Sequence, residues 1–308
     1  MQRILVTGAA GQLGKSFMSH LSSMHGSDNV YGLTRSTPPS STGNRNVYLS
    51  GDITNWKQMD EHIQKNQIST IIHLAAVLTT EAEKDPHLAL NVNVNGLHTI
   101  LELAAKHHLL VFWPSSIAAL DGCPIKEQVP QIAAMNPATV YGMTKVMGEE
   151  LTSLYSRSFH VDVRSVRYPS IISPHPTKSG ATAEFASAIF SEGVKNGFYR
   201  LPVSPTTALP FMYIDDAINA AITLLQAPRT SLTVTRSYNI GGFHATAQEL
   251  VQEIQKLTHL QIEYAPDERD AVAQSWPNSV DDTSAQNDWG WKPQFTLEKT
   301  VSTMLSLT

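Results

Sequence analysis

A glycine-rich turn near the N-terminus constrains the fold of this chain more than any other feature. The run Val6-Thr7-Gly8-Ala9-Ala10-Gly11-Gln12-Leu13-Gly14 follows the apolar residues Ile4-Leu5-Val6 and opens a helical pattern. Gly8 permits a tight turn, Gly11 lets the backbone approach a pyrophosphate, and Gly14 lets helix and strand pack closely. The free N–H groups of a helix N-terminus bind phosphate. We therefore predict a dinucleotide site at Gly8, Gly11, Gln12, Leu13 and Gly14.

Apolar strands alternate with helical patterns through the first half of the chain. The runs 4–6, 29–33, 69–74, 109–113 and 161–167 are apolar on both faces, and helices are expected over about 14–25 and 86–107. Strands of this kind, separated by helices, favour an α/β fold with a Rossmann-type, doubly wound parallel sheet. We assign this domain to residues 1–172 and expect the segments at about 209–242 to return to it. Residues 173–308 are expected to form mainly a smaller, partly helical substrate lobe.

Composition excludes several classes of partner. The chain has 308 residues, is 42% hydrophobic and carries a formal charge of -5 with no long basic run, so nucleic acid and anionic membranes are poor partners. Its single cysteine, Cys123, leaves no Cys/His metal cluster and no internal disulfide. No leader peptide or membrane-spanning run is evident, which predicts a cytoplasmic protein.

Tyr141 and Lys145 form a proton-transfer pair in the sequence. Residues four apart on a helix share one face, and a cation beside a phenol favours the ionised phenol. A hydroxyl such as that of Ser116 can hold a substrate oxygen against the phenol. We expect the helix that carries Tyr141 to be capped by Asn136, with Pro137 at its first position. These residues are suited to moving a proton on or off an alcohol.

The residues after the second and third predicted strands bear on the type of dinucleotide. An acid commonly follows the second strand where NAD is bound, but this chain has Thr34 and Arg35, a pair that suits a 2′-phosphate. Arg35 could instead stack near the adenine or point into solvent, with Thr34 or Ser36 on the ribose. Asp52 could accept from the adenine amino group, cap the helix at 55–62, or do both. NAD and NADP both stay open on these residues.

Several motifs resemble the extended short-chain dehydrogenase/reductase family. They are the glycine run, His73-Leu74-Ala75-Ala76, Asn93-Val94-Asn95-Gly96, Ser115-Ser116 and Tyr141-x-x-x-Lys145. The resemblance implies a Rossmann fold, NAD as the cofactor and Ser116, Tyr141 and Lys145 as catalytic residues. It also implies cofactor contacts from Ile53, Leu74, Ala75, Ala76, Asn93, Tyr168 and Pro169, in addition to Thr34, Arg35 and Asp52.

A narrower resemblance concerns the short-chain L-threonine 3-dehydrogenases within that family. The shared segments are 88–98, 163–169, 209–217, Ser275-Trp276-Pro277, Asp281-Asp282 and 288–291. This resemblance implies oxidation of the C3 hydroxyl of L-threonine to 2-amino-3-oxobutanoate. The departures are Thr34 in place of an acid, Ser116 in place of Thr, and Ala183 in place of a hydroxyl residue. The alternatives are a nucleotide-sugar epimerase or dehydratase and a non-catalytic dinucleotide-binding protein.

The resemblance also suggests how the small substrate and a second subunit are bound. The candidate substrate contacts, which are uncharged, are Thr79, Thr80, Ser115, Ser116, Tyr141, Gly180, Thr182 and Trp276. Asp215 and Asp216 are expected to cap the helix that follows them. The helix at 86–107 and the helix with Tyr141 would pair with their copies in a homodimer.

Overall fold

Seven parallel strands form the central sheet of the computed structural model, which describes residues 2–35, 47–174 and 182–307. The strand order is β10-β6-β5-β4-β1-β2-β3, and each neighbouring pair is parallel. The strands are β1 (Ile4–Thr7), β2 (Val30–Thr34), β3 (Val47–Ser50), β4 (Thr70–His73), β5 (Leu110–Ser116), β6 (Asp162–Tyr168) and β10 (Tyr238–Asn239). The predicted Rossmann-type sheet is therefore confirmed, and ligands of such sheets bind at the carboxyl ends of the strands.

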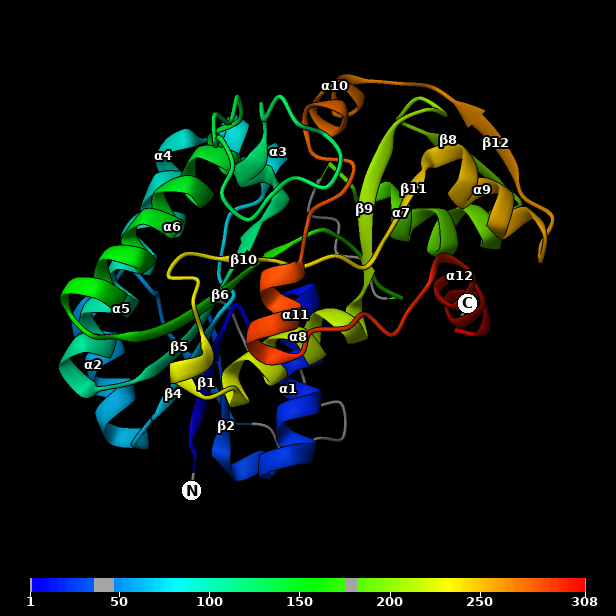
Figure 1. The fold of residues 1–308 in the computed structure, drawn as a ribbon. Helices are drawn as coiled ribbons and strands as arrows, with labels where there is room; N and C mark the ends of the chain where they lie inside the picture. Colours follow the sequence, from blue (N-terminus) through cyan, green and yellow to red (C-terminus); the bar gives the residue numbers. More distant parts are fainter. Residues whose placement is uncertain (1, 36–46, 175–181, 308) are drawn as a thin grey trace.

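Helices cover both faces of this sheet (Figure 1). One face carries α1 (Gln12–His25), α8 (Ile214–Gln226) and α11 (Thr283–Trp289). The other face carries α2 (Trp56–Asn66), α5 (Gly96–His107) and α6 (Val140–Ser158). Separate hydrophobic clusters fill the two faces, because strands apolar on both sides must bury both.

A smaller lobe stands beside the carboxyl ends of the strands (Figure 1, right). Its strands form one sheet in the order β11-β9-β7 and a second, parallel pair of β12 with β8. The elements are β7 (Ser170–Ile172), α7 (Phe185–Ala188), β8 (Phe198–Leu201), β9 (Ala208–Tyr213), β11 (Phe243–Thr246), α9 (Ala247–Gln255), β12 (Gln261–Tyr264), α10 (Glu268–Ser275) and α12 (Leu297–Ser306). The chain passes back from this lobe through α8 and β10, which pack on and pair with the central sheet.

The helix predicted over 86–107 is interrupted. It consists of α4 (Pro86–Ala89), a π-helical turn at Leu90–Asn95 and α5, and it is preceded by the short α3 (Thr79–Lys84). A second π turn, Ile189–Val194, follows α7, and short 3-10 turns lie at Ser27–Asn29, Ile117–Leu120 and Arg229–Ser231. Such π turns are rare and occur often at functional sites.

Two predicted helix caps, at Asn136 and at Asp215 and Asp216, are wrong, and the alternative of a cap at Asp52 is not formed. Helix α6 begins at Val140, and Thr139 rather than Asn136 caps it, accepting from Gly142 N at 3.1 Å. Asn55 caps α2, while Asp52 closes the turn before it by accepting from Thr54 N. Helix α8 has no side-chain cap. Asp216 instead accepts from the backbone N–H groups of Gln294 and Phe295, which holds the segment before α12 against α8.

Candidate active site

The glycine turn after β1 has the geometry predicted for it. Gly8 has a φ of +68°, and a Cβ atom there would lie 2.8 Å from Ala75 N. A Cβ atom on Gly14 would lie 2.2 Å from the Gly8 carbonyl oxygen, so helix α1 could not approach β1 with any side chain at this position. Gly11 is the N-cap of α1, with no side-chain cap and no acidic residue in the first turn. This helix N-terminus therefore fits a phosphate group.

A cavity opens beside this turn, at the carboxyl ends of β1, β4, β5 and β6. Its volume is about 200 Å³. Predicted residues from both halves of the chain meet in its lining: Gln12, Leu13, Leu74, Ala76, Thr79, Ser115, Ser116, Tyr141, Lys145, Tyr168, Pro169, Thr182 and Trp276. The cavity therefore brings together the glycine turn, the proton-transfer pair and part of the predicted substrate contacts.

Ser116 and Tyr141 both line the cavity, and the Ser116 hydroxyl lies near enough to that of Tyr141 to act on its pKa as a hydrogen-bond donor. The Ser116 hydroxyl also accepts from Ala118 N at 3.2 Å, which fixes it at the end of β5. Burial raises the pKa of Tyr141 to about 12, and the hydrogen bond from Ser116 opposes that rise. The sequence predicts a phenol with a lowered pKa, and this prediction is wrong. The desolvation of the phenolate raises the pKa of Tyr141 by more than the neighbouring groups lower it.

Lys145 lies buried beside Tyr141, one turn further along α6. Its ammonium group donates to the Pro114 carbonyl oxygen at 2.7 Å and lies 5.5 Å from the centre of the Tyr141 ring and 4.8 Å from that of Trp113. Burial lowers the pKa of Lys145 to about 7, and the charge of Glu149 opposes that fall. A protonated Lys145 at this distance favours the Tyr141 phenolate, so the charge on Lys145 matters for proton transfer.

Helix α6 is fixed at its first turn by a residue that sequence reasoning missed. The Glu83 carboxylate of α3 accepts from Val140 N at 2.7 Å and from Tyr141 N at 3.4 Å. A carboxylate at a helix N-terminus both fills open N–H groups and interacts favourably with the helix dipole. Glu83 therefore anchors the turn that carries Tyr141.

Two predicted residues are engaged in contacts that support the site. Asn93, within the π turn, accepts from Val77 N at 2.7 Å and donates to the Val77 carbonyl oxygen at 2.9 Å and to Thr144 Oγ1 at 3.0 Å. It thus ties the segment after β4 to α6. The Ser115 hydroxyl donates to Glu149 at 2.6 Å, so the neighbouring Ser116 is the serine whose hydroxyl meets Tyr141.

The predicted residues for the far end of a dinucleotide lie outside this cavity. Thr34 is buried at the end of β2, and the Arg35 side chain that follows is exposed. The Asp52 carboxylate also accepts from Thr54 Oγ1 at 2.8 Å, and Ile53 is buried. Among the described residues Thr80 does not line the cavity, and Gly180 and Ser36 lie outside the described ranges.

The cavity has a charged wall residue that the sequence did not single out. Glu184 lines it together with Ser170 and Ser187. A carboxylate in the lining of the cavity that also holds the Ser116 and Tyr141 hydroxyl groups suits a small substrate that carries an ammonium group. Glu184 was missed because it follows a loop without periodicity, where no local pattern shows which side chain faces inward.

In the part of the chain that the structure describes, no group of three or more His, Cys, Asp or Glu side chains could hold a metal ion. None of the helices in the described ranges combines the length and apolar character needed to cross a membrane.

Comparisons with known proteins agree with this geometry. Residues 4–241 match the model of the NAD dependent epimerase/dehydratase family. The mitochondrial L-threonine 3-dehydrogenase of Bos taurus is 39% identical over 99% of this chain and 82% of that protein. A holo GalE-like L-threonine dehydrogenase from Cupriavidus necator superposes with a TM-score of 0.96 at 38% identity, over 99% of each chain. A monomeric L-threonine 3-dehydrogenase from a metagenome database gives 0.94 at 37% identity, over 98% of this chain and 97% of that one. The chain belongs to the NAD dependent epimerase/dehydratase family, the extended short-chain dehydrogenases/reductases that its motifs resemble.

Proposed function

We propose that this protein oxidises the C3 hydroxyl of L-threonine to the ketone of 2-amino-3-oxobutanoate. The observation that carries the proposal is that Ser116, Tyr141 and Lys145 meet in one small cavity beside the Gly8–Gly14 turn. The similarity of the whole chain to proteins named L-threonine dehydrogenases supports this choice of alcohol.

The chain's own residues account for the proton in this reaction. Ser116 holds the substrate hydroxyl oxygen, and Tyr141 accepts the hydroxyl proton as general base. The protonated Lys145 stabilises the phenolate needed for that step. A nicotinamide dinucleotide, when bound, supplies the acceptor for the hydride that leaves C3.

The amino acid end of the substrate would meet the other wall of the cavity. The Glu184 carboxylate suits the substrate ammonium group, and the hydroxyl groups of Thr79 and Thr182 suit its carboxylate. Trp276, which is buried in the same wall, limits the space for larger groups. This arrangement also discriminates against a 3-hydroxy acid that lacks the ammonium group.

We propose NAD as the cofactor, held by the Gly8–Gly14 turn, with Leu74, Ala76, Tyr168 and Pro169 around its nicotinamide half. The exposed Arg35 leaves NADP as the alternative, since a cation at the end of β2 suits a 2′-phosphate. Reduction of both NAD and NADP therefore has to be measured.

The similarity of the whole chain to proteins named L-threonine dehydrogenases favours an amino acid over a nucleotide sugar. The test is to mix the purified protein with L-threonine and either NAD or NADP and to follow absorbance of the reduced cofactor. Reduction with L-threonine is expected. Turnover of a UDP-sugar without reduction by L-threonine would favour the epimerase alternative, and binding of dinucleotide without any turnover would favour the non-catalytic one.

We further propose a cytoplasmic homodimer. Helix α6 presents Met143, Met147 and Leu154 to solvent on one face, and an exposed apolar stripe suits the helix pairing expected from the family. The dimer needs a direct test, because one similar protein is named as monomeric. The cytoplasmic location needs one as well, because the bovine relative is named as mitochondrial.

A further inference from the structure

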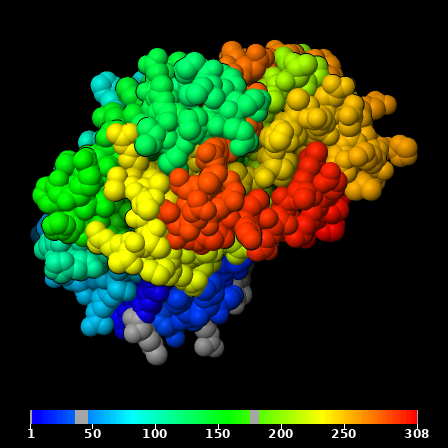
Figure 2. Space-filling model, in the orientation of Figure 1, coloured from blue at the N-terminus to red at the C-terminus, as the bar shows by residue number. Residues whose placement is uncertain are grey.

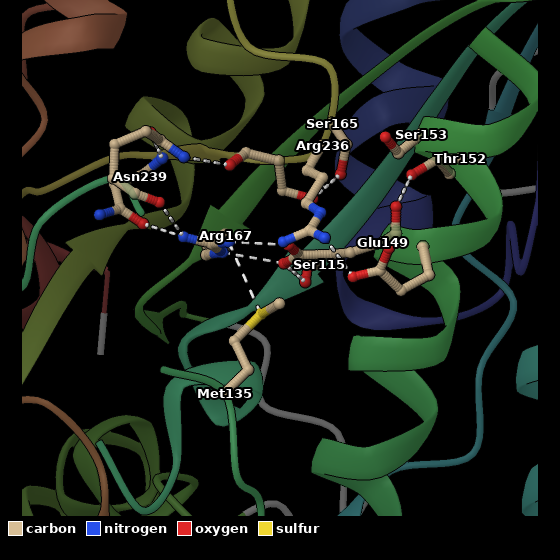
Figure 3. Close-up of polar contacts among 12 residues, drawn as sticks. Ser115, Met135, Glu149, Thr152, Ser153, Ser165, Arg167, Arg236 and Asn239 are labelled. Carbon is tan, nitrogen blue, oxygen red and sulfur yellow. Dashed lines mark hydrogen bonds and ion pairs between the residues drawn. The ribbon is translucent and has the colours of Figure 1, made fainter. Parts of the chain in front are cut away.

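Figure 3 shows a buried ion pair between helix α6 and strand β6, and its α6 member lies one turn along the helix from Lys145. Glu149 on α6 is fully buried and Arg167 on β6 is 2% exposed. The pairing is bidentate: Arg167 Nε donates to Glu149 Oε1 at 2.9 Å and Arg167 Nη2 donates to Glu149 Oε2 at 2.8 Å. Ser115 donates a third hydrogen bond to Oε1 at 2.6 Å. An isolated charge is costly to bury, so this site is built to keep the carboxylate ionised.

The pair is adjacent to the lysine of the active site. Tyr141, Lys145 and Glu149 follow one another at intervals of four residues, so they line a single face of α6. The negative charge of Glu149 raises the pKa of Lys145, against the larger effect of burial. Of the groups around Lys145, Glu149 is therefore the one whose charge favours the ammonium form.

The other groups around Lys145 do not replace that charge. From β4, the buried His73 is neutral near pH 7, because burial and the charge of Lys145 lower its pKa to about 3. From β5, Lys145 meets the Pro114 carbonyl oxygen and the Trp113 ring, which are dipoles rather than anions. Tyr141 is a neutral phenol until it ionises. Glu184 lies in the wall of the same cavity, on the other lobe.

Arg167 is held by neutral groups that fix its direction. Its Nη1 donates to Asn239 Oδ1 at 2.9 Å and to the Gln131 carbonyl oxygen at 3.1 Å. Asn239 in turn donates to the Val129 carbonyl oxygen at 3.0 Å. The segment that contains these two carbonyls, 121–139, packs against residues 275–281 through bonds such as Val129 N to the Ser279 carbonyl oxygen. Figure 2 shows this blue-green segment lying against the orange C-terminal residues.

The net charge of Lys145, Arg167 and Glu149 suits the ionisation of Tyr141. Lys145 and Arg167 are cations and Glu149 is an anion, so the group carries one net positive charge before Tyr141 ionises and none afterwards. Without Glu149, two buried cations would lie behind the phenol with no anion. Arginine stays protonated in proteins, so the lysine would be the group that loses its proton.

We propose that Glu149 is a positioning residue of the active site, whose buried negative charge keeps Lys145 protonated behind Tyr141 while Arg167 holds the carboxylate in place. The proposal deepens the proposed function, because it assigns the group that maintains the charge on which proton transfer depends. It makes no use of the identity of the alcohol.

The direct test is the titration of Lys145 in the whole protein. Competitive labelling of amines with acetic anhydride over a pH series, followed by mass spectrometry of the Lys145 peptide, reports the fraction of neutral amine. Glu149→Gln removes the negative charge, so the Lys145 curve should shift to lower pH by roughly one unit. The labelling of Lys145 needs no L-threonine, so its result does not depend on whether the proposed function is correct.

A matched control keeps the charges and breaks a neutral contact of the same network. Asn239→Ala removes one of the two acceptors of Arg167 Nη1 and should lower thermal stability while leaving the Lys145 titration in place. If Glu149→Gln does not fold, Arg167→Gln gives the opposite test, because it removes the cation that offsets the Glu149 charge, and the Lys145 curve should then move to higher pH. Superimposable curves for wild type and the charge variants would overturn the proposal.

The reaction itself gives a second readout. Removal of the Glu149 anion makes Lys145 lose its proton at lower pH, so the basic limb of the pH profile of kcat/KM, which reports that loss, should move to lower pH in Glu149→Gln. A role in packing alone would lower the rate without moving that limb. An unshifted limb together with an unshifted Lys145 titration would assign Glu149 to packing.

Discussion

Tyr141 has to lose a proton at a place where burial opposes the charged form. Its pKa is raised to about 12 by burial, while that of Lys145 is lowered to about 7 by the same cause. Near neutral pH the phenol therefore depends on its immediate neighbours, the Ser116 hydroxyl and the Lys145 ammonium group. At the scale of single residues, the site works through these two contacts rather than through an intrinsically acidic phenol.

Substitution of Tyr141 by phenylalanine tests this dependence. Tyr141→Phe removes the proton acceptor and keeps the ring, so kcat should fall by about 10²–10⁴-fold while cofactor binding persists. The measurement is steady-state kinetics with a separate titration of dinucleotide by fluorescence. Tyr155→Phe is a matched control on the same helix, since the Tyr155 hydroxyl contacts His98 at 3.0 Å, away from the cavity. A Tyr141→Phe enzyme as active as Tyr155→Phe would exclude Tyr141 as the base.

At the scale of elements, helix α6 carries most of the site, and its start is set by long-range contacts. Thr139 caps it, and Glu83 from α3 accepts from its first two N–H groups. The local sequence predicts an earlier start, because Asn136-Pro137 is a typical N-terminal signal. Here residues 136–138 instead belong to the loop held by Asp121, which accepts from Ala138 N at 2.8 Å.

Removal of the Glu83 carboxylate should therefore disturb both stability and rate. Glu83→Ala is expected to lower the free energy of unfolding by about 0.5–2 kcal/mol, the range for a lost helix cap, and to reduce kcat because Tyr141 lies in the first turn. Thermal unfolding and steady-state kinetics measure the two effects. Glu81→Ala, on the exposed side of the same short helix, is the control. Equal behaviour of the two variants would mean that Glu83 does not anchor α6.

The parts of the site predicted from the sequence depend on spacing along one element. The turn at Gly8 and the Tyr141–Lys145 pair are of this kind. Glu149 also follows that spacing and could have been found four residues after Lys145. Its partner could not, because strand register decides it: Ser115 on β5 pairs with Arg167 on β6, which brings both side chains to Glu149. Glu184 likewise reaches the cavity through the packing of the second lobe.

At the scale of the whole molecule, the cavity lies where the central sheet meets the smaller lobe. Ser116 and Tyr141 come from the first, and Glu184 and Trp276 come from segments far along the chain. The exposed apolar stripe Met143, Met147 and Leu154 lies on the helix that carries Tyr141, so a partner subunit would brace the catalytic helix from outside.

A charge in that stripe tests the dimer. Met147→Glu should convert a dimer to a monomer, because an unpaired carboxylate would be buried at the interface. Light scattering coupled to size-exclusion chromatography gives the mass directly. Leu257→Glu is the control, since Leu257 is also exposed but lies on the other lobe. A wild-type protein that elutes as a monomer would contradict the proposed dimer and leave the chemistry of the cavity untouched.

The most direct measurement of the central claim is transfer of deuterium from C3 of L-threonine. The protein would be incubated with L-threonine deuterated at C3 and NAD or NADP, and the reduced cofactor analysed by mass spectrometry. The account predicts one deuterium in the reduced nicotinamide, together with loss of this transfer in Tyr141→Phe. Reduced cofactor without deuterium, or no reduction with either dinucleotide, would contradict oxidation at the C3 hydroxyl.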